Sequence, residues 1–254
     1  MNRLLLLLLL LTISIAAQAD DCDHTSQIER MVDAATLNKL DVTAGAGRLK
    51  IMGYKGSSEI KIAATLCASS KKNLKRMDVV FDVAADTGSI KTDMPDNSGL
   101  FFSGSNSIDL TLYVPESMLL NVKDSSGSAD IENVAGLMMV DSSGSLSIKN
   151  VTGEVDVTDS SGSILIEQVV GSVKLSDSSG AIDVNNVGAD VLVRVDSSGS
   201  ISAQNVTGDF VVNVDSSGSI SAANIGGHFW VRKDSSGGIH YRNIGGQVDI
   251  PKGK

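Results

Sequence analysis

The chain has 254 residues, of which 30 are acidic and 21 are Lys or Arg, and its formal net charge is −9. This charge argues against nucleic acid or anionic lipid as the main partner, because both are themselves negative. Aromatic residues make up only 4%, while Gly, Ser, Val and Ile are abundant. Such a composition favours β-structure over long helices.

The first 19 residues have the three parts of a secretory signal peptide. Arg3 supplies a basic start, residues 4–15 are apolar but too few to span a bilayer comfortably, and Ala17-Gln18-Ala19 fits a cleavage site. We therefore predict cleavage after Ala19 and export to the periplasm or the cell surface. An uncleaved anchor helix is the alternative. No later segment is apolar over about 18 residues, so we expect no membrane span.

The chain contains two cysteines, Cys22 and Cys67. In an exported protein this even count predicts one disulfide, which would fix the first segment of the mature chain. Two unpaired thiols are the alternative. Cys22 follows Asp20 and Asp21 rather than small residues, which argues against attachment of a lipid at this cysteine.

Residues 20–40 form a lead-in, and residues 41–123 alternate apolar and polar side chains without a clean repeat. The stretch "GRLKIMGYKGSSEIKIAATL" (47–66) predicts a strand, a turn and a strand, as in one coil of a solenoid. The stretch "SIDLTLYVPES" (107–117) predicts a further strand with Pro115 at its edge. We expect irregular coils over 41–123 and regular coils over 124–250, within one β-helix domain of residues 41–254.

Seven copies of Asp-Ser-Ser-Gly then follow at a nearly constant period. They begin at Asp124, Asp141, Asp159, Asp177, Asp196, Asp215 and Asp234, at intervals of 17, 18, 18, 19, 19 and 19 residues. A period of this kind is typical of repeat proteins, whose units bury their apolar side chains only by stacking on one another. We predict an all-β fold in which coils of 17–19 residues stack as a parallel β-helix.

Each repeat contains a half-buried strand at a fixed place. The fifth and seventh residues after Asp are apolar and the residue between them is mostly polar, so the fifth residues, which include Ile164, Ile182, Ile201 and Ile220, should form one inward column. The ninth residue is Asn in six repeats and Gln168 in one. From there to the next Asp the distance grows from 8 to 10 residues, so we expect only the second limb to absorb changes in length.

The Asp-Ser-Ser-Gly tetrad has the pattern of a type I turn. The carboxylate would accept hydrogen bonds from backbone N–H groups two or three residues on, and Gly would close the turn without steric cost. With coils about 4.8 Å apart, the Ser hydroxyls could also bond along the row. A ladder of calcium sites is the rival interpretation, but the second corner of each coil, Asn-Val-x-Gly, carries no carboxylate. We therefore expect a corner and no metal site.

The strands of residues 47–54 and 107–117, followed by serial "DSSGSI-x-x-x-NV-x-G" coils, resemble the bacterial putative-adhesin family of β-strand-repeat envelope proteins, which is related to the putative auto-transporter adhesin head domains. The resemblance covers residues 41–250. It implies a right-handed, single-stranded β-helix in an exported protein, and it implies no catalytic residue.

Two classes of function are compatible with the sequence. In the limb of fixed length, from Asp to Asn, the outward positions hold scattered acidic residues among Ser, Leu and Ala, without an acid and a base at matching height. The three His residues lack the spacing of metal ligands. We therefore expect a non-enzymatic, adhesin-like binding scaffold of the cell envelope, without catalytic residues, cofactor or metal. A carbohydrate-active enzyme on a β-helix is the alternative, and a groove that holds two carboxylates within about 10 Å would favour it.

The last two coils carry the candidate partner-binding residues. Phe229 and Val231 align with the inward residues of the preceding coil, so their neighbours must point outward. Outward aromatic and basic side chains are unusual on a Ser-rich surface and are of the kind that anchors interfaces and stacks on sugars. The candidates for binding an envelope glycan or protein are His228, Trp230 and Arg232 on this limb and, on the other limb, His240 and Arg242, which we also expect to face outward. The alternative is a cap, in which Tyr241 and Pro251 close the core and Trp230 covers it.

Overall fold

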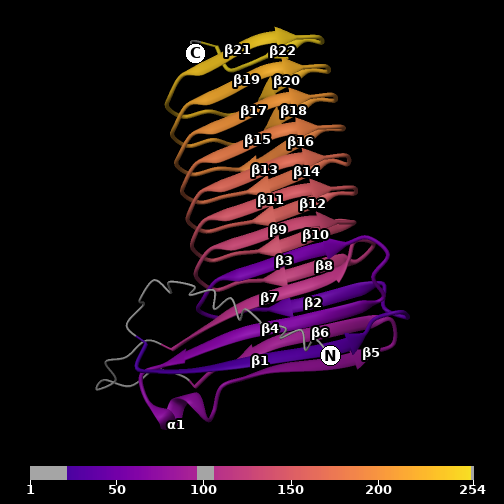
Figure 1. Ribbon diagram of the computed structural model, residues 1–254. Helices are drawn as coiled ribbons and strands as arrows, with labels where there is room; N and C mark the ends of the chain where they lie inside the picture. Colours follow the sequence, from indigo (N-terminus) through magenta and orange to yellow (C-terminus); the bar gives the residue numbers. More distant parts are fainter. Residues whose placement is uncertain (1–21, 96–105, 253–254) are drawn as a thin grey trace, which may run out of the picture.

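The protein is a stack of β-coils in a computed structural model that describes residues 22–95 and 106–252 (Figure 1). The predicted signal peptide lies outside the described residues. Two 11-stranded sheets, called here sheet A and sheet B, enclose one continuous apolar core. The only helix in the described part of the chain is the four-residue α1 (Lys71–Leu74) at the N-terminal end of the stack.

Sheet A contains the strands that begin after each Asp-Ser-Ser-Gly corner. From the N-terminal end of the stack the order is β1 (His24–Asp33), β4 (Glu59–Ala68), β7 (Ser107–Pro115), β3 (Leu49–Tyr54), β9 (Ala129–Val134), β11 (Leu146–Val151), β13 (Ile164–Val169), β15 (Ile182–Val187), β17 (Ile201–Val206), β19 (Ile220–Ile225) and β21 (Ile239–Ile244).

Sheet B contains the return strands, which are shorter in the later coils. From the same end the order is β5 (Asp78–Ala84), β6 (Thr87–Asp93), β2 (Lys39–Thr43), β8 (Leu119–Lys123), β10 (Gly136–Val140), β12 (Val155–Thr158), β14 (Val173–Ser176), β16 (Val191–Val195), β18 (Phe210–Val212), β20 (Phe229–Val231) and β22 (Val248–Asp249).

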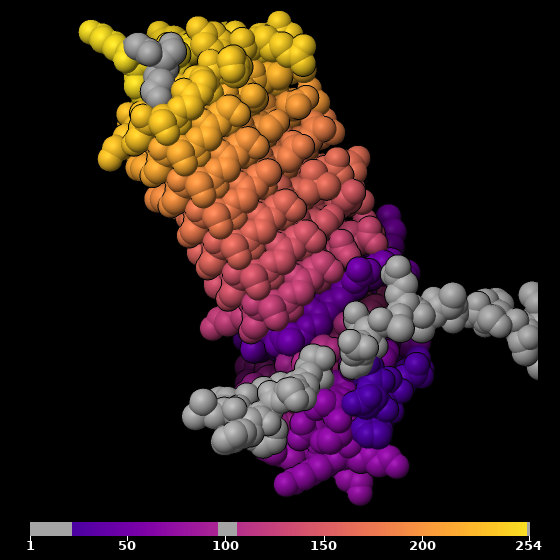
Figure 2. Space-filling view, turned by 90° about the vertical axis from the view of Figure 1, so that its left-hand side faces the viewer, coloured from indigo at the N-terminus to yellow at the C-terminus, as the bar shows by residue number. Residues whose placement is uncertain are grey.

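From β8 onward each strand pairs in parallel with the equivalent strand of the next coil, which confirms the predicted parallel β-solenoid. The predicted inward column is present: Ile164, Ile182, Ile201 and Ile220 face one another in register and are buried. On sheet B the rings of Phe210 and Phe229 stack with centroids 5.3 Å apart. The coils appear as parallel ridges across the regular half of the molecule (Figure 2).

The N-terminal half is not wound in chain order. Strands β2 and β3 form one level of the stack, and β8 and β9 lie directly above that level, whereas β4 to β7 lie below it. The chain therefore makes one coil, builds the base beneath it, and returns to continue upward. The expectation that residues 47–66 make one coil is wrong, because β3 and β4 both belong to sheet A with β7 between them.

Antiparallel pairs close the base of the solenoid. Strand β1, within the predicted lead-in, pairs with β4; β4 pairs with β7; and β5 pairs with β6. A disulfide between Cys22 and Cys67, with Cα atoms 5.5 Å apart, joins the start of β1 to β4, as the cysteine count predicted. In the described residues there is no helix with the length and apolar character of a membrane span.

Candidate functional site

The five candidate residues of the last coils lie on two different faces. His228, Trp230 and Arg232 belong to the limb of sheet B, whereas His240 and Arg242 lie on β21 of sheet A. Since the inward side chains of both sheets share one core, the outward side chains leave it in opposite directions. The fold therefore separates the predicted patch into two groups.

The ring of His228 is engaged by the last coil. Its Nδ1 atom accepts a hydrogen bond of 2.8 Å from the backbone N–H of Gln247, just as Asp209 accepts one of 2.6 Å from the N–H of His228. The His228 ring also stacks on Trp230, with centroids 5.0 Å apart and planes 14° apart. His228 thus holds the next coil in place and fixes the indole ring of Trp230.

The cap interpretation fits Tyr241 but not Trp230. Tyr241 stands in the inward column opposite Ala222, and its ring lies 5.9 Å from that of Phe229, so it covers part of the core at this end. Trp230 pairs with Val211 and Asp249 on the outer face of sheet B and therefore does not cover the end of the core.

Three apolar side chains in register form a strip on the outer face of sheet B. We call Leu192, Val211 and Trp230, on β16, β18 and β20, the C-terminal strip; all three are partly exposed. Arg194 and Arg232 flank it along the chain on one side, and Asp209 and His228 on the other. In the regular coils, by contrast, the outward positions of sheet A carry mostly Ser, Asn, Gln and charged side chains.

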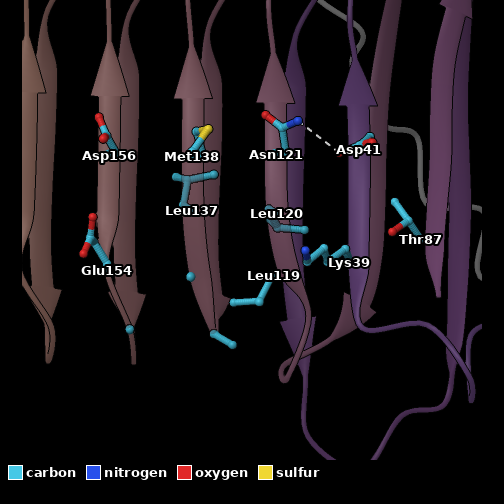
Figure 3. Close-up of a pocket in the computed structure, with 13 residues that line it drawn as sticks. Lys39, Asp41, Thr87, Leu119, Leu120, Asn121, Leu137, Met138, Glu154 and Asp156 are labelled. Atoms are coloured by element: carbon cyan, nitrogen blue, oxygen red, sulfur yellow. Dashed lines mark hydrogen bonds between the residues drawn. The ribbon is translucent and has the colours of Figure 1, made fainter.

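A hollow of about 580 Å³ lies on the same outer face, nearer the N-terminal end (Figure 3). Its apolar part contains Leu119, which is 45% exposed, and Met138, which is 56% exposed. The Leu119 side chain leans over Gly136, which is buried, because a Cβ at Gly136 would meet Leu119 Cδ2 at 3.0 Å. The hollow coincides with the shortest coil, in which only 8 residues separate Asn133 from the next Asp.

Charged side chains border the hollow. Lys39 and Asp41 lie on β2, Asp156 lies on β12, and Glu154 directly precedes β12 (Figure 3). Each carboxylate is bonded to another side chain: Asp41 Oδ1 accepts from Asn121 at 3.0 Å, Glu154 Oε1 pairs with Lys174 Nζ at 2.6 Å, and Asp156 pairs with Arg194.

The seven Asp residues of the tetrads form a column inside the corner. The side chains of Asp124, Asp141, Asp159, Asp177, Asp196 and Asp215 are only 0–4% exposed. The corner is present. Asp159 Oδ1 accepts a hydrogen bond of 3.3 Å from the N–H group two residues on, as predicted, and a shorter one of 2.7 Å from the N–H group of the next residue, which was not predicted. The Ser hydroxyls bond along the row as expected, for example Ser161 Oγ to the carbonyl oxygen of Ser142 at 3.3 Å.

Burial gives this column unusual acid–base properties. The second oxygen, Oδ2, of Asp124, Asp141, Asp159 and Asp177 is buried without a hydrogen-bond partner in the described structure. Burial, reinforced by the neighbouring carboxylates, raises the pKa of Asp159 and Asp196 to about 6 and that of Asp124 to about 7. Among the described residues, no group of three His, Cys, Asp or Glu is arranged to hold a metal ion.

Sequence reasoning missed the hollow and the burial of the Asp column. The 17-residue interval was a usable signal for the hollow, because one residue fewer at a corner removes a side chain from an otherwise even surface. The burial had no such signal, since a turn Asp has the same sequence pattern whether its carboxylate faces water or the core.

Fold and surface together define a two-sheet parallel β-solenoid with a polar and a partly apolar face. The family model described as Toastrack DUF4097 matches residues 37–222, and the chain belongs to this family. This membership confirms the family resemblance seen in the repeats. No curated protein matches the chain.

Three bacterial proteins are among the solved structures to which the chain is similar. A putative cell adhesion protein from Clostridium sporogenes is 13% identical, with 89% of this chain and 99% of that chain covered and a TM-score of 0.40. A putative adhesin from Parabacteroides merdae is 13% identical, with coverages of 91% and 97% and a TM-score of 0.41. A putative lipid binding protein from Parabacteroides distasonis is 16% identical, with coverages of 89% and 97% and a TM-score of 0.41.

Proposed function

We propose that this protein is an exported, non-enzymatic binding scaffold of the cell envelope and that its partner docks on the C-terminal strip of sheet B. The observation that carries the proposal is the alignment of Leu192, Val211 and Trp230 in one outward row, flanked by Arg194 and Arg232. Apolar and aromatic side chains bordered by Arg are typical of interface anchors. The rigid stack holds them in fixed register without any induced change.

The chemistry of the strip fits a glycan or a protein of the envelope. An indole ring that is held in place by His228 offers a flat, pre-oriented surface for stacking on a sugar ring or an apolar side chain, at little cost in side-chain entropy. Arg194 is paired with Asp156, but the exposed guanidinium group of Arg232 favours a carboxylate or phosphate group on the same partner.

Export of the protein is supported by two further features. Residues 1–19 have the pattern of a signal peptide, and a disulfide such as that between Cys22 and Cys67 persists in oxidising compartments. The scaffold would act in the periplasm or at the cell surface.

Retention of the purified protein on isolated envelope material tests the proposal. Trp230→Ala should reduce retention by about tenfold, since truncated interface anchors commonly cost more than 1 kcal/mol. Val170→Ala, which shortens an exposed side chain at the second corner of its coil, is the matched control and should bind normally. If Trp230→Ala lowers the melting temperature but leaves retention unchanged, Trp230 only stabilises the last coils and the strip is not the site.

A carbohydrate-active enzyme remains the second candidate, and the hollow gives it one specific observation. Glu154 and Asp156 line the hollow two residues apart, at the start of β12, with Asp41 across from them, so the hollow does contain the carboxylates that such an enzyme needs. All three are bonded to Asn121, Lys174 or Arg194, as in structural cross-strand pairs. Release of reducing sugars from envelope polysaccharides by the wild type, but not by Glu154→Gln, would establish the enzyme and refute a non-enzymatic scaffold.

A further inference from the structure

The hollow on sheet B has a two-fold pattern of side chains. Its midline runs between β8 and β10, and β2 and β12 lie one strand further out on either side. Lys39, Leu119, Gly136 and Glu154 occupy the same outward position on these four successive strands. The backbone positions of Lys39 and Glu154 therefore lie at about equal distances from the midline, roughly 7 Å each for strands 4.8 Å apart, with the apolar positions between them.

We propose that a second copy of this chain docks on the hollow, so that two solenoids pack antiparallel through the N-terminal half of the outer face of sheet B. A two-fold axis parallel to the strands, placed over the midline, reverses the order of strands but keeps each outward position in line. Lys39 then faces the partner's Glu154, and Leu119 faces the partner's Gly136. The symmetry repeats both contacts, because such an interface uses the same patch on each copy.

The shape of the hollow suits this arrangement. Leu119 and Met138 are exposed apolar side chains of the hollow, and Leu119 leans over the buried Gly136. In the antiparallel dimer these side chains from both copies gather around the axis and remove their apolar surface from water. A hollow that is open to solvent in one copy thereby becomes the centre of an interface.

One like-charged contact must be accommodated. In the next outward position, Asp41 faces the partner's Asp156. The carboxylate of Asp156 is paired with the guanidinium of Arg194 within its own chain, and Asp41 accepts a hydrogen bond from Asn121. The arginine therefore offsets the repulsion. Glu154 is paired with Lys174 in its own chain, so in the dimer it lies between two lysines, Lys174 and the partner's Lys39.

A parallel arrangement of two copies lacks this match. A two-fold axis along the solenoid would exchange the two ends of every strand, so that Leu119 would face the partner's Lys123 and Lys39 would face the partner's Thr43. Neither contact pairs opposite charges or apolar groups. The distribution of side chains therefore selects the antiparallel dimer.

The dimer would be of modest strength and would leave Val211 and Trp230 of the C-terminal strip outside the overlap, with Leu192 on β16 at its edge. Eight strands of each sheet B overlap, from β5 to β16, which gives about 600 Å² per copy from strand spacing and length, at the lower end of stable interfaces. Strands β18, β20 and β22 extend beyond the overlap, so each copy presents Trp230 at its own end. The inference thus goes beyond the proposed binding function and does not depend on it.

Charge reversal at the paired positions tests the proposal. Sedimentation equilibrium of the purified protein over a wide concentration range should show a monomer–dimer equilibrium. Lys39→Glu and Glu154→Lys should each raise the dissociation constant by about tenfold, because each creates two like-charged pairs. The double variant with both substitutions should recover the wild-type constant, since it restores opposite charges across the axis.

Lys50→Glu, a reversal on sheet A, is the matched control and should leave the dissociation constant unchanged. Melting curves of all variants check that the fold is retained. A wild type that is monomeric at every concentration overturns the proposal, and so does a dimer that ignores both single reversals or is not recovered in the double variant. Retention of these variants on envelope material through Trp230 is a separate result that bears only on the proposed function.

Discussion

At the second corner of each regular coil, called here the Asn corner, a single residue adopts a left-handed backbone conformation. Asn133, Asn150, Asn186, Asn205, Asn224 and Asn243 have positive φ, as does Gln168 at 59°, and Asn tolerates this left-handed conformation better than most residues. The amide groups also form a ladder: Asn224 Nδ2 donates to Asn205 Oδ1 at 2.9 Å, and Asn243 repeats this contact on Asn224. The six Asn residues thus both adopt the left-handed backbone conformation and form hydrogen bonds between adjacent coils.

Gln168 is the exception, and replacing it should help. We expect Gln168→Asn to stabilise the protein by about 1 kcal/mol, because Asn tolerates positive φ better and can bond to the adjacent corners. Chemical denaturation of the variant beside Asn186→Gln measures this. The second variant should lose a similar amount, and if both changes destabilise, the corner is not selected for its left-handed conformation.

The Asp column is the element in which burial and charge conflict. Its carboxyl groups have folded-state pKa values raised by burial, to about 6 for Asp159 and Asp196 and about 7 for Asp124, above the ordinary value of about 3.9 for an unfolded Asp. The folded state therefore binds more protons than the unfolded state between these values. Stability from this source is complete below about pH 4 and is lost as the pH rises through 6 to 7.

Removing one carboxyl group should reduce this loss. We expect Asp196→Asn to be more stable than the wild type at pH 8, by on the order of 2 kcal/mol, because a neutral amide escapes the cost of a buried charge. At pH 4 the advantage should vanish. Urea denaturation at both pH values measures the difference, and equal destabilisation at pH 4 and pH 8 would mean that the ionised carboxylate is required by the corner.

The same column gives a prediction about metal. Within the described residues no cluster suits a metal ion, and the tetrads act as corners that hold their own backbone. Chelation of calcium should therefore leave the melting temperature unchanged in differential scanning calorimetry. A fall of many degrees would show that calcium binds the folded state and would restore the calcium-ladder interpretation.

At the scale of the whole molecule, the sequence predicted the regular half of the fold but not the base. A constant period places Ile201 above Ile182 without further information, because equivalent positions of stacked coils must align. Strands β4 to β7 carry no repeat, so nothing local states that they lie beneath β2 and β3 rather than above them. Their order is decided by long-range antiparallel pairing, which single-sequence patterns do not contain.

The candidate site was predictable only in part, for the same reason. Alternation correctly placed Phe229 and Val231 in the core and Trp230 on the surface. The grouping of Trp230 with His240 and Arg242 failed as a single patch, because the two limbs of a coil face opposite sides. The apolar strip depends on Leu192, Val211 and Trp230 standing in register across three coils, and their 19-residue spacing, equal to the period there, was a usable signal in the sequence.

The claim that sheet B carries the partner-binding face has one direct test. Val211→Asp places a charge in the middle of the C-terminal strip, and Ser221→Asp places the same charge on the outward face of sheet A at a similar height. Affinity for envelope material should fall by about tenfold or more for Val211→Asp and remain at the wild-type value for Ser221→Asp, with both folds intact. Loss of affinity for Ser221→Asp alone would contradict the account and assign binding to sheet A.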